Sequence, residues 1–411
     1  MFFGFEFLPP FVKELFVAAV GFIFKAWMDR RKFTELKSDF KQKLDEHEEN
    51  AKSHYGDLAL REAQLGESKE RLVELQQVID DRGAAVNLSE ERLNRLLATL
   101  ADGETGVWSS RPPLPPFDNY LNRTSRTPVK GATKPRPLIM TLVNYKGGVG
   151  KTTTTANLAG YFDLKLKKRV LMLDLDYQGS LTTVLKKAAK SIERDGRIAE
   201  LFESGAGLAQ LLVLAERLGN ALPNSSFVRS FYEFAHVEER LMVQWLLERT
   251  HDDVRYRLAR ILLDDDLGKQ FDVVLIDAPP RLTAGTINAL CASTHVLVPT
   301  IMDSVSAEPV INFLRQTDSL MRVLNPSIKV VGVLETMAPP ATWRARPRDV
   351  AILDVKEALK KSFPHITLMT TSIPRKPILT DGSLAYGTDR DVTTIFNHLG
   401  DEIVKRVGVL P

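Results

Sequence analysis

The sequence contains a single cysteine, Cys291, among its 411 residues. One thiol excludes a disulfide framework within the chain and any zinc or iron–sulfur centre that needs several cysteine ligands. It also favours a reducing, cytoplasmic location. A large excess of one charge is missing as well, because 55 Lys and Arg residues are balanced by 52 Asp and Glu residues. The chain is therefore not a general nucleic-acid coat or an acidic tail, and any basic surface must be local.

Long apolar runs are scarce, and the main candidate lies at the N-terminus. Residues 1–28 hold eight phenylalanines, and residues 15–24 carry no charge. That stretch is shorter than the about 20 apolar residues of a bilayer-spanning helix. Trp27 and the basic residues 30–32 match the pattern of a cytoplasmic-side membrane interface. We predict that residues 1–28 bind lipid at the inner face of the cytoplasmic membrane. An apolar arm packed on a partner or on itself is the alternative.

Proline is absent from residues 29–101, where charges of both signs alternate. Apolar residues recur there at every seventh position, which predicts a long helix. They are Leu44, Ala51, Leu58, Leu65, Leu72, Ile79 and Val86. Of the two positions in each heptad that face a partner in a coiled coil, the second is mostly polar. The pattern is therefore compatible either with a coiled coil or with a helix or hairpin that packs against another subunit. Residues 102–137 then hold seven prolines, which predicts an extended linker that belongs to neither neighbour.

A glycine-rich loop opens residues 138–411, which we predict to form one domain. An apolar run at 138–144 leads into KGGVGKTT (146–153), and a helical pattern follows. In this context backbone N–H groups and a helix N-terminus bind phosphate. Lys151 is expected on the β- and γ-phosphates of ATP, and the Thr152 hydroxyl on Mg²⁺. The other predicted nucleotide-binding residues of the loop are Lys146, Gly147, Gly148, Val149, Gly150 and Thr153.

Two further apolar runs end in aspartates. Residues 169–173 lead into Asp174 and Asp176, and residues 271–276 lead into Asp277. The carboxyl ends of parallel strands line the ligand crevice of an open sheet, so these side chains should gather near the phosphates. Asp277 is expected to ligate Mg²⁺, and Asp176 to orient an attacking water. Asp174 is more simply read as a cap for the next helix.

Apolar runs and helical patterns alternate through the rest of the chain. Strands are expected at 294–300 and 328–335, helices at 283–292 and 307–324, while 181–270 reads as mostly helical. The alternation predicts an α/β fold with a doubly wound, mostly parallel sheet and a phosphate loop. A long N-terminal helical arm would precede it.

The chain resembles the ParA/MinD/Soj family of deviant Walker A ATPases over residues 137–407. The resemblance rests on KGGVGKTT (146–153), DLDYQG (174–179), FDVVLIDAPP (271–280) and TSIPRKP (371–377). It implies a homodimer formed on ATP binding, in which Lys146 reaches the phosphates of the facing subunit. It also implies catalytic roles for Lys146, Lys151 and Asp176. Asp277 would be the Walker B aspartate, and Pro374 would contact the nucleotide.

Two positions depart from the family pattern. The family usually has proline where Tyr177 stands and asparagine where Ser180 stands, but Asp176 and Gln178 match. We therefore expect ATP hydrolysis with weak intrinsic turnover, stimulated by a ParB-like or other protein partner. MinD attaches to membranes through a C-terminal amphipathic helix, whereas residues 391–411 here read as a closing helix of the domain.

Basic residues gather between positions 344 and 376. By the same resemblance, this half of the fold binds DNA without sequence preference, through phosphate neutralisation. The DNA-binding candidates are Arg344, Arg346, Arg348, Arg375 and Lys376. The alternative is an ordinary solvated helix face.

Two functions follow from these patterns. The first is a ParA-like switch that positions or segregates DNA or other cargo, which the basic residues favour. The second is a membrane-tethered, MinD-like regulator or adaptor that does not bind DNA, which residues 1–28 favour. Tyrosine autokinases carry a related phosphate loop but usually end in a tyrosine-rich tail, and no tyrosine follows Tyr386 here.

Overall fold

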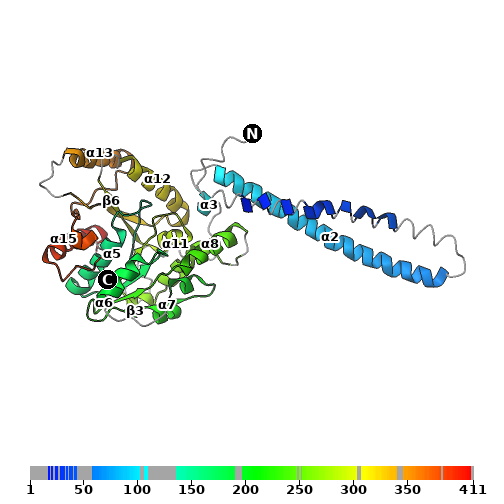
Figure 1. Cartoon of the computed structure of the whole chain (residues 1–411), viewed down its shortest axis with the longest axis horizontal. Helices are drawn as coiled ribbons and strands as arrows, with labels where there is room; N and C mark the ends of the chain where they lie inside the picture. The colour runs from blue at the N-terminus through cyan, green and yellow to red at the C-terminus, as the bar shows by residue number, and fades with distance from the viewer. Residues whose placement is uncertain are drawn as a thin grey trace. The chain divides into compact units, whose positions relative to one another are not determined.

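The computed structural model describes residues 58–101, 106–109, 136–189, 197–247, 250, 252–302, 307–339, 346–380 and 383–408, with parts of 17–43. The chain divides into two units, with the boundary between Ala98 and Thr99. The first unit holds most of the N-terminal arm, and the second holds the sheet (Figure 1).

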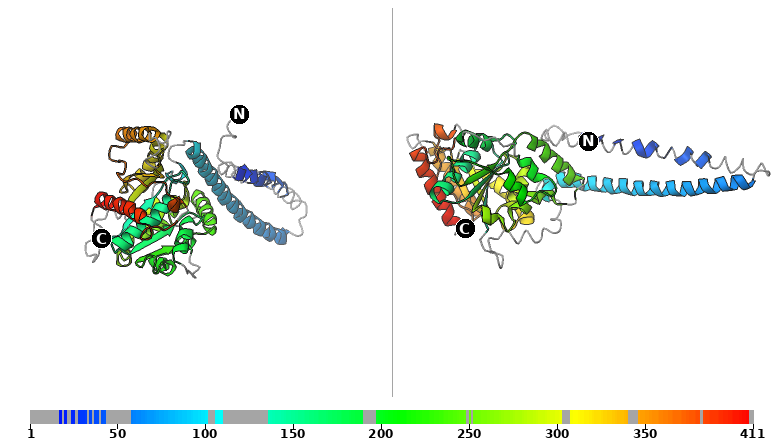
Figure 2. Two further views of the ribbon diagram at one scale, coloured as in Figure 1. Left: turned by 60° about the vertical axis from the view of Figure 1, so that its left-hand side comes forward. Right: turned by 90° about the horizontal axis from the view of Figure 1, so that it is seen from below.

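The first unit is built on α2, a helix of 44 residues (Leu58–Ala101). The described residues of 17–43 are helical and run beside α2 (Figures 1 and 2), and Arg30 lies 3.8 Å from Glu90 in an ion pair. The predicted helical arm is thus confirmed. The heptad residues Leu72, Ile79 and Val86 are partly buried while most of their neighbours are exposed, as expected of a helix with one covered stripe. Coiled-coil pairing with another chain stays a prediction.

The predicted membrane segment, residues 1–28, lies largely outside the described residues. Within the described part of the chain, no helix combines the length and apolarity needed to cross a bilayer.

A seven-stranded sheet organises the second unit, in the order β3-β4-β2-β5-β1-β6-β7. All neighbouring strands are parallel except β3 and β4, which are antiparallel. The strands are β1 (Leu138–Leu142), β2 (Val170–Asp174), β3 (Glu216–Arg217), β4 (Ser225–Val228), β5 (Val273–Asp277), β6 (His295–Ile301) and β7 (Lys329–Thr336). Alternate side chains of β1, β2 and β5 enter two separate cores, one on each face, so the doubly wound fold is confirmed.

Helices cover both faces of the sheet. The core on one face, which holds Met140 and Met172, is closed by α5 (Lys151–Gly160), α6 (Ser180–Ala189), α14 (Pro377–Thr380) and α15 (Arg390–Val407), with a π-helical turn at Tyr161–Lys165. The opposite core, which holds Ile139 and Leu171, is closed by the remaining larger helices. These are α7 (Leu208–Leu214), α8 (Glu233–Leu246), α9 (Arg257–Leu262), α11 (Ala284–Ala292), α12 (Ala307–Leu324) and α13 (Arg346–Ser362). Short turns lie at Ile198–Phe202, Val254–Tyr256 and α10 (Leu267–Gln270).

The stretch 181–270 differs from the expectation that it is mostly helical. It contributes two short strands, β3 and β4, and its last helical pattern is divided between α8 and α9. β4 has only four residues, two of them serine, and its pairing with β2 supplies the hydrogen bonds. A strand this short carries too few side chains to display its period in the sequence.

The predicted linker also differs from expectation where it is described. Trp108, in α3 (Gly106–Ser109), is 2% exposed and lies in the core of the second unit. The Arg255 guanidinium donates to the Trp108 carbonyl over 2.7 Å. Arg136, near the other end of the predicted linker, pairs with Asp265 at 3.1 Å. The ends of the segment therefore belong to the domain, because a buried tryptophan fastens one of them; residues 110–135 lie outside the described residues.

Candidate nucleotide-binding site

The glycine loop joins the end of β1 to the start of α5. Gly148 and Gly150 have φ values of 70° and 76°, which residues with side chains rarely adopt. Three strands hold the loop in place. The Asn144 side chain accepts from the Lys146 N–H (2.9 Å) and donates to the Pro299 carbonyl (2.9 Å). Thr336, at the end of β7, donates to the Val149 carbonyl (2.9 Å). The loop is thus shaped by its surroundings around the N-terminus of α5, which favours an anion.

Lys151 is the first residue of α5, and its ammonium group lies inside the loop. Nζ donates to the carbonyls of Asn144 (3.0 Å) and Lys146 (3.2 Å). Burial lowers the pKa of Lys151, and the charges of Asp277 and Asp176 act in the opposite direction. Backbone carbonyls are weak partners for a buried cation, so a phosphate group entering the loop would stabilise this charge.

Asp277 and Thr152 form the predicted metal pair. The Thr152 hydroxyl donates to Asp277 Oδ2 over 2.6 Å. Asp277 Oδ1 is buried and makes no hydrogen bond within the protein. Burial, followed by the charge of Asp174, raises the pKa of Asp277 to about 8. An oxygen left without a partner beside a hydroxyl suits a hard cation such as Mg²⁺, so these residues fit the metal.

Asp174 ends β2 at the same level as Asp277 ends β5. Its carboxylate accepts from the backbone N–H (2.8 Å) and hydroxyl (2.7 Å) of Thr182, in the first turn of α6. Burial raises its pKa to about 7, and those hydrogen bonds lower it. Asp174 therefore serves as the helix cap that the sequence suggested.

Asp176 follows on the loop after β2 and is half-buried. Its Oδ1 accepts from the Gln178 N–H over 3.0 Å. The negative charge of Asp176 raises the pKa of Asp277 and of Glu238, so the three carboxyl groups share one neighbourhood. The structure thus brings Lys151, Asp277 and Asp176 together. Which of them acts in hydrolysis stays a prediction.

A cavity adjoins the loop on the side of α14. The predicted residues Gly150, Thr153, Pro374, Arg375 and Lys376 line it. Pro374 is held there by a parallel bridge to Ala338, just beyond β7. Thr336, Met337 and Leu379 also line the cavity and had not been predicted. Thr336 and Met337 lie at the end of β7 and Leu379 lies in α14. The end of β7 resembles any other buried strand in the sequence, so only the fold identifies these residues.

The basic candidates are engaged to different extents. Arg348 binds Glu335 through two contacts of 2.5 and 2.6 Å, and Lys376 binds Asp391 at 2.6 Å. Arg375 is exposed at the cavity. Arg344 and the side chain of Arg346 lie outside the described residues. Two of the five candidates thus already have carboxylate partners within the protein.

Comparisons with known proteins agree with this geometry. A family model described as an AAA domain matches residues 138–330. The chromosome-partitioning ATPase Soj of Thermus thermophilus is 32% identical over 205 residues, 50% of this chain and 71% of Soj. The chromosome partitioning protein ParA of Myxococcus xanthus is 28% identical over 269 residues, 65% of this chain and 88% of ParA.

Solved structures share the fold of the second unit. Cobyrinic acid a,c-diamide synthase from Mycobacterium smegmatis, with an ATP analogue and magnesium, has a TM-score of 0.54 at 24% identity and covers 67% of this chain and 98% of its own. McdA of Cyanothece, in complex with ATP, has a TM-score of 0.53 at 20% identity, with the same coverage. The ligands of these two structures match the predicted cofactors, ATP and Mg²⁺.

Proposed function

Because this chain belongs to the ParA/Soj family of ATPases, we propose that it hydrolyses ATP to ADP and phosphate as a dimerisation switch. Two copies associate when ATP is bound and separate after hydrolysis. The switch positions or segregates DNA or other cargo. Turnover is slow until a ParB-like or other protein partner stimulates it.

The observation that carries this proposal is the set of buried ionisable groups around the glycine loop. Lys151 is buried against backbone carbonyls, and Asp277 keeps one oxygen without a hydrogen bond. Such groups are costly in a protein that never binds a ligand there. Lys151 would hold the phosphates, and Thr152 with Asp277 would hold Mg²⁺, which neutralises charge on the phosphates when bound.

In this proposal Asp176 orients the attacking water. It lies on the loop after β2, close enough to Asp277 at the end of β5 to raise the pKa of Asp277. Lys146 is exposed at the start of the loop, as a residue that reaches a facing subunit must be. ATP would then lie within the dimer interface, and loss of the γ-phosphate would weaken that interface.

DNA is the first candidate for the surface that the dimer holds. Arg375 supports it, since this side chain is exposed at the cavity that adjoins the glycine loop. ATP bound at the loop would alter its access. The second candidate is a membrane. Val17, Val20, Phe24 and Met28 support it, because all four apolar side chains are exposed. In that case the chain would act as a membrane-tethered regulator without DNA contact.

Co-sedimentation distinguishes the two surfaces. The full-length protein is mixed with non-specific duplex DNA or with liposomes containing anionic lipid, each with ATP, ADP or no nucleotide. We expect DNA binding only with ATP, and a loss of binding as salt rises. Liposome binding without DNA binding would support the membrane-tethered alternative. Lys151→Ala is the control, because it should bind neither surface in a nucleotide-dependent way.

A further inference from the structure

Glu238 is a buried carboxylate near the nucleotide site that none of the sequence motifs includes. It lies on α8 and is 7% exposed. Its Oε1 accepts from the Gly285 N–H over 2.9 Å and from the Thr283 hydroxyl. Thr283 caps α11, and the loop that leads to it begins at Asp277. Glu238 therefore fastens the far end of the loop that follows Asp277, the predicted metal ligand.

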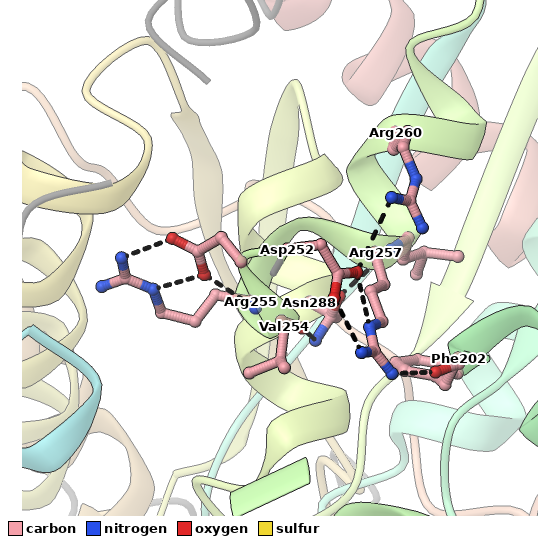
Figure 3. Close-up of polar contacts among 9 residues, drawn as sticks. Phe202, Asp252, Val254, Arg255, Arg257, Arg260 and Asn288 are labelled. Atoms are coloured by element: carbon pink, nitrogen blue, oxygen red, sulfur yellow. Dashed lines mark hydrogen bonds and ion pairs between the residues drawn. The ribbon is translucent and has the colours of Figure 1, made fainter. Parts of the chain in front are cut away.

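The contact between Glu238 and α11 leaves no free space. A Cβ atom added to Gly285 would lie 2.7 Å from Glu238 Oε1 and 3.1 Å from the Phe234 ring. The rest of α11 is tied down separately. Asn288 donates to the Val254 carbonyl (2.8 Å) and accepts from the Leu258 N–H (3.1 Å), as Figure 3 shows in part. The first turn of α11 is thus held by α8, and its middle by the Val254–Tyr256 turn and the start of α9.

The start of α8 contacts the other loop of the site. Tyr232, which precedes α8, packs edge to face against Tyr177, with 5.9 Å between ring centroids. The Arg281 guanidinium, from the loop after Asp277, lies 5.2 Å from the centre of the Tyr177 ring. Tyr177 directly follows Asp176. α8 and the residue before it therefore contact both the loop that holds Asp176 and the loop that follows Asp277.

The far end of α8 is fixed in the core. Trp245 is fully buried, and the Arg255 guanidinium lies 4.1 Å from the centre of its ring. Arg255 also pairs with the buried Asp253 at 2.6 Å. This packing fixes the C-terminal end of α8, so that Glu238 and Tyr232 can hold the loop after Asp277 and the loop with Asp176.

We propose that Glu238 is a positioning residue for ATP hydrolysis. By holding Thr283 and Gly285, it fixes the loop from Asp277 to α11 and keeps Arg281 against Tyr177, beside Asp176. Glu238 does not touch the reacting atoms. It sets the distance between the loop that follows Asp277 and the loop that holds Asp176. This inference rests on the proposed ATPase function.

The test compares kcat, KM and the affinity for a non-hydrolysable ATP analogue in four purified full-length variants. Glu238→Ala should lower kcat about tenfold, because small displacements of reacting groups are costly, and leave analogue affinity within about threefold. Glu238→Gln should restore most of kcat, since its amide oxygen can still accept from Gly285 and Thr283. Gly285→Ala should reproduce the loss by displacing the Glu238 carboxylate. Glu239→Ala is the matched control, because Glu239 is an exposed neighbour on the same helix.

An unchanged kcat in Glu238→Ala would overturn the inference. So would a glutamine variant as inactive as the alanine one, which would make the carboxylate itself catalytic. If Glu238→Ala does not fold, a normal kcat in soluble Gly285→Ala overturns it instead. Asp176→Ala is measured in parallel. Normal turnover in that variant contradicts the proposed function, whereas an inactive Asp176→Ala beside a normal Glu238→Ala contradicts this inference alone.

Discussion

The glycine loop and the basic residues beyond position 344 are both predicted to bind phosphate groups. They differ in how far their ionisable side chains are already paired within the protein. Around the loop, Lys151 is buried against carbonyls and Asp277 retains an oxygen without a hydrogen bond. Among the basic candidates, Arg348 binds Glu335 and Lys376 binds Asp391. A buried ionisable group whose hydrogen bonds within the protein are weak or incomplete marks a place that a ligand completes. A paired charge can be explained by the protein alone.

Replacing Lys151 should produce the largest effect and tests the loop side of this comparison. Lys151→Ala removes the cation that lies inside the loop, so ATP affinity should fall at least about 100-fold, equivalent to about 3 kcal/mol. Turnover would be lost with it. Titration calorimetry with ATP and Mg²⁺ measures the change, and Lys187→Ala, an exposed lysine on α6, is the control. Tight ATP binding by Lys151→Ala would show that the loop is not the nucleotide site.

Asp176→Ala should separate binding from hydrolysis. Loss of a group that orients water should reduce kcat roughly 100-fold. ATP binding should persist, because the phosphate loop and the Asp277–Thr152 pair are intact. We therefore expect dimers that form with ATP and do not dissociate, which light scattering combined with size-exclusion chromatography would detect. Normal turnover would remove Asp176 from the mechanism.

The same contrast explains how far the sequence could predict this molecule. The loop 146–153 was predicted from the sequence because its function depends on local features, namely glycines at left-handed positions and a helix that starts at Lys151. The parallel sheet was predicted because its central strands are buried on both faces and read as apolar runs. Glu238 could not be predicted, because its contacts with Thr283 and Gly285 depend on α8 packing against α11. The pairing of Arg348 with Glu335 was equally hidden, since 13 residues separate the partners.

Arg348 and Arg375 give the comparison a sharper test within the basic region. Arg348→Ala would leave Glu335, which is 6% exposed, without its partner. The free energy of unfolding of the Arg348→Ala protein should be about 1–2 kcal/mol lower than that of the native protein, while its affinity for duplex DNA stays within about twofold. Arg375→Ala should instead change DNA binding and not stability. It should weaken ATP-dependent DNA binding several-fold, reduce the dependence of log K on log salt by about 1, and leave stability unchanged.

Chemical denaturation and DNA titrations at several salt concentrations measure both quantities. Equal losses of DNA binding in the two variants would mean that Arg348 leaves Glu335 to contact phosphate. An unaffected Arg375→Ala would direct attention to the membrane-tethered alternative.

Asp277→Asn should change the stability of the ligand-free protein in the opposite sense from Arg348→Ala. The pKa of Asp277 is raised to about 8 by burial, from an ordinary value of 3.8, so the folded protein holds a proton that the unfolded chain releases between these values. Stability without ligand must therefore decline as pH rises toward 8. Asparagine cannot ionise, so the variant should be more stable than the native protein at pH 8.5, by about 1 kcal/mol or more, and this difference should shrink as the pH falls toward about 4. Thermal melts in EDTA without nucleotide measure the difference. A variant less stable than the native protein at pH 8.5 would show that the Asp277 carboxylate is already stabilised within the protein. The loop would then not differ from the basic region in the way its side chains are paired.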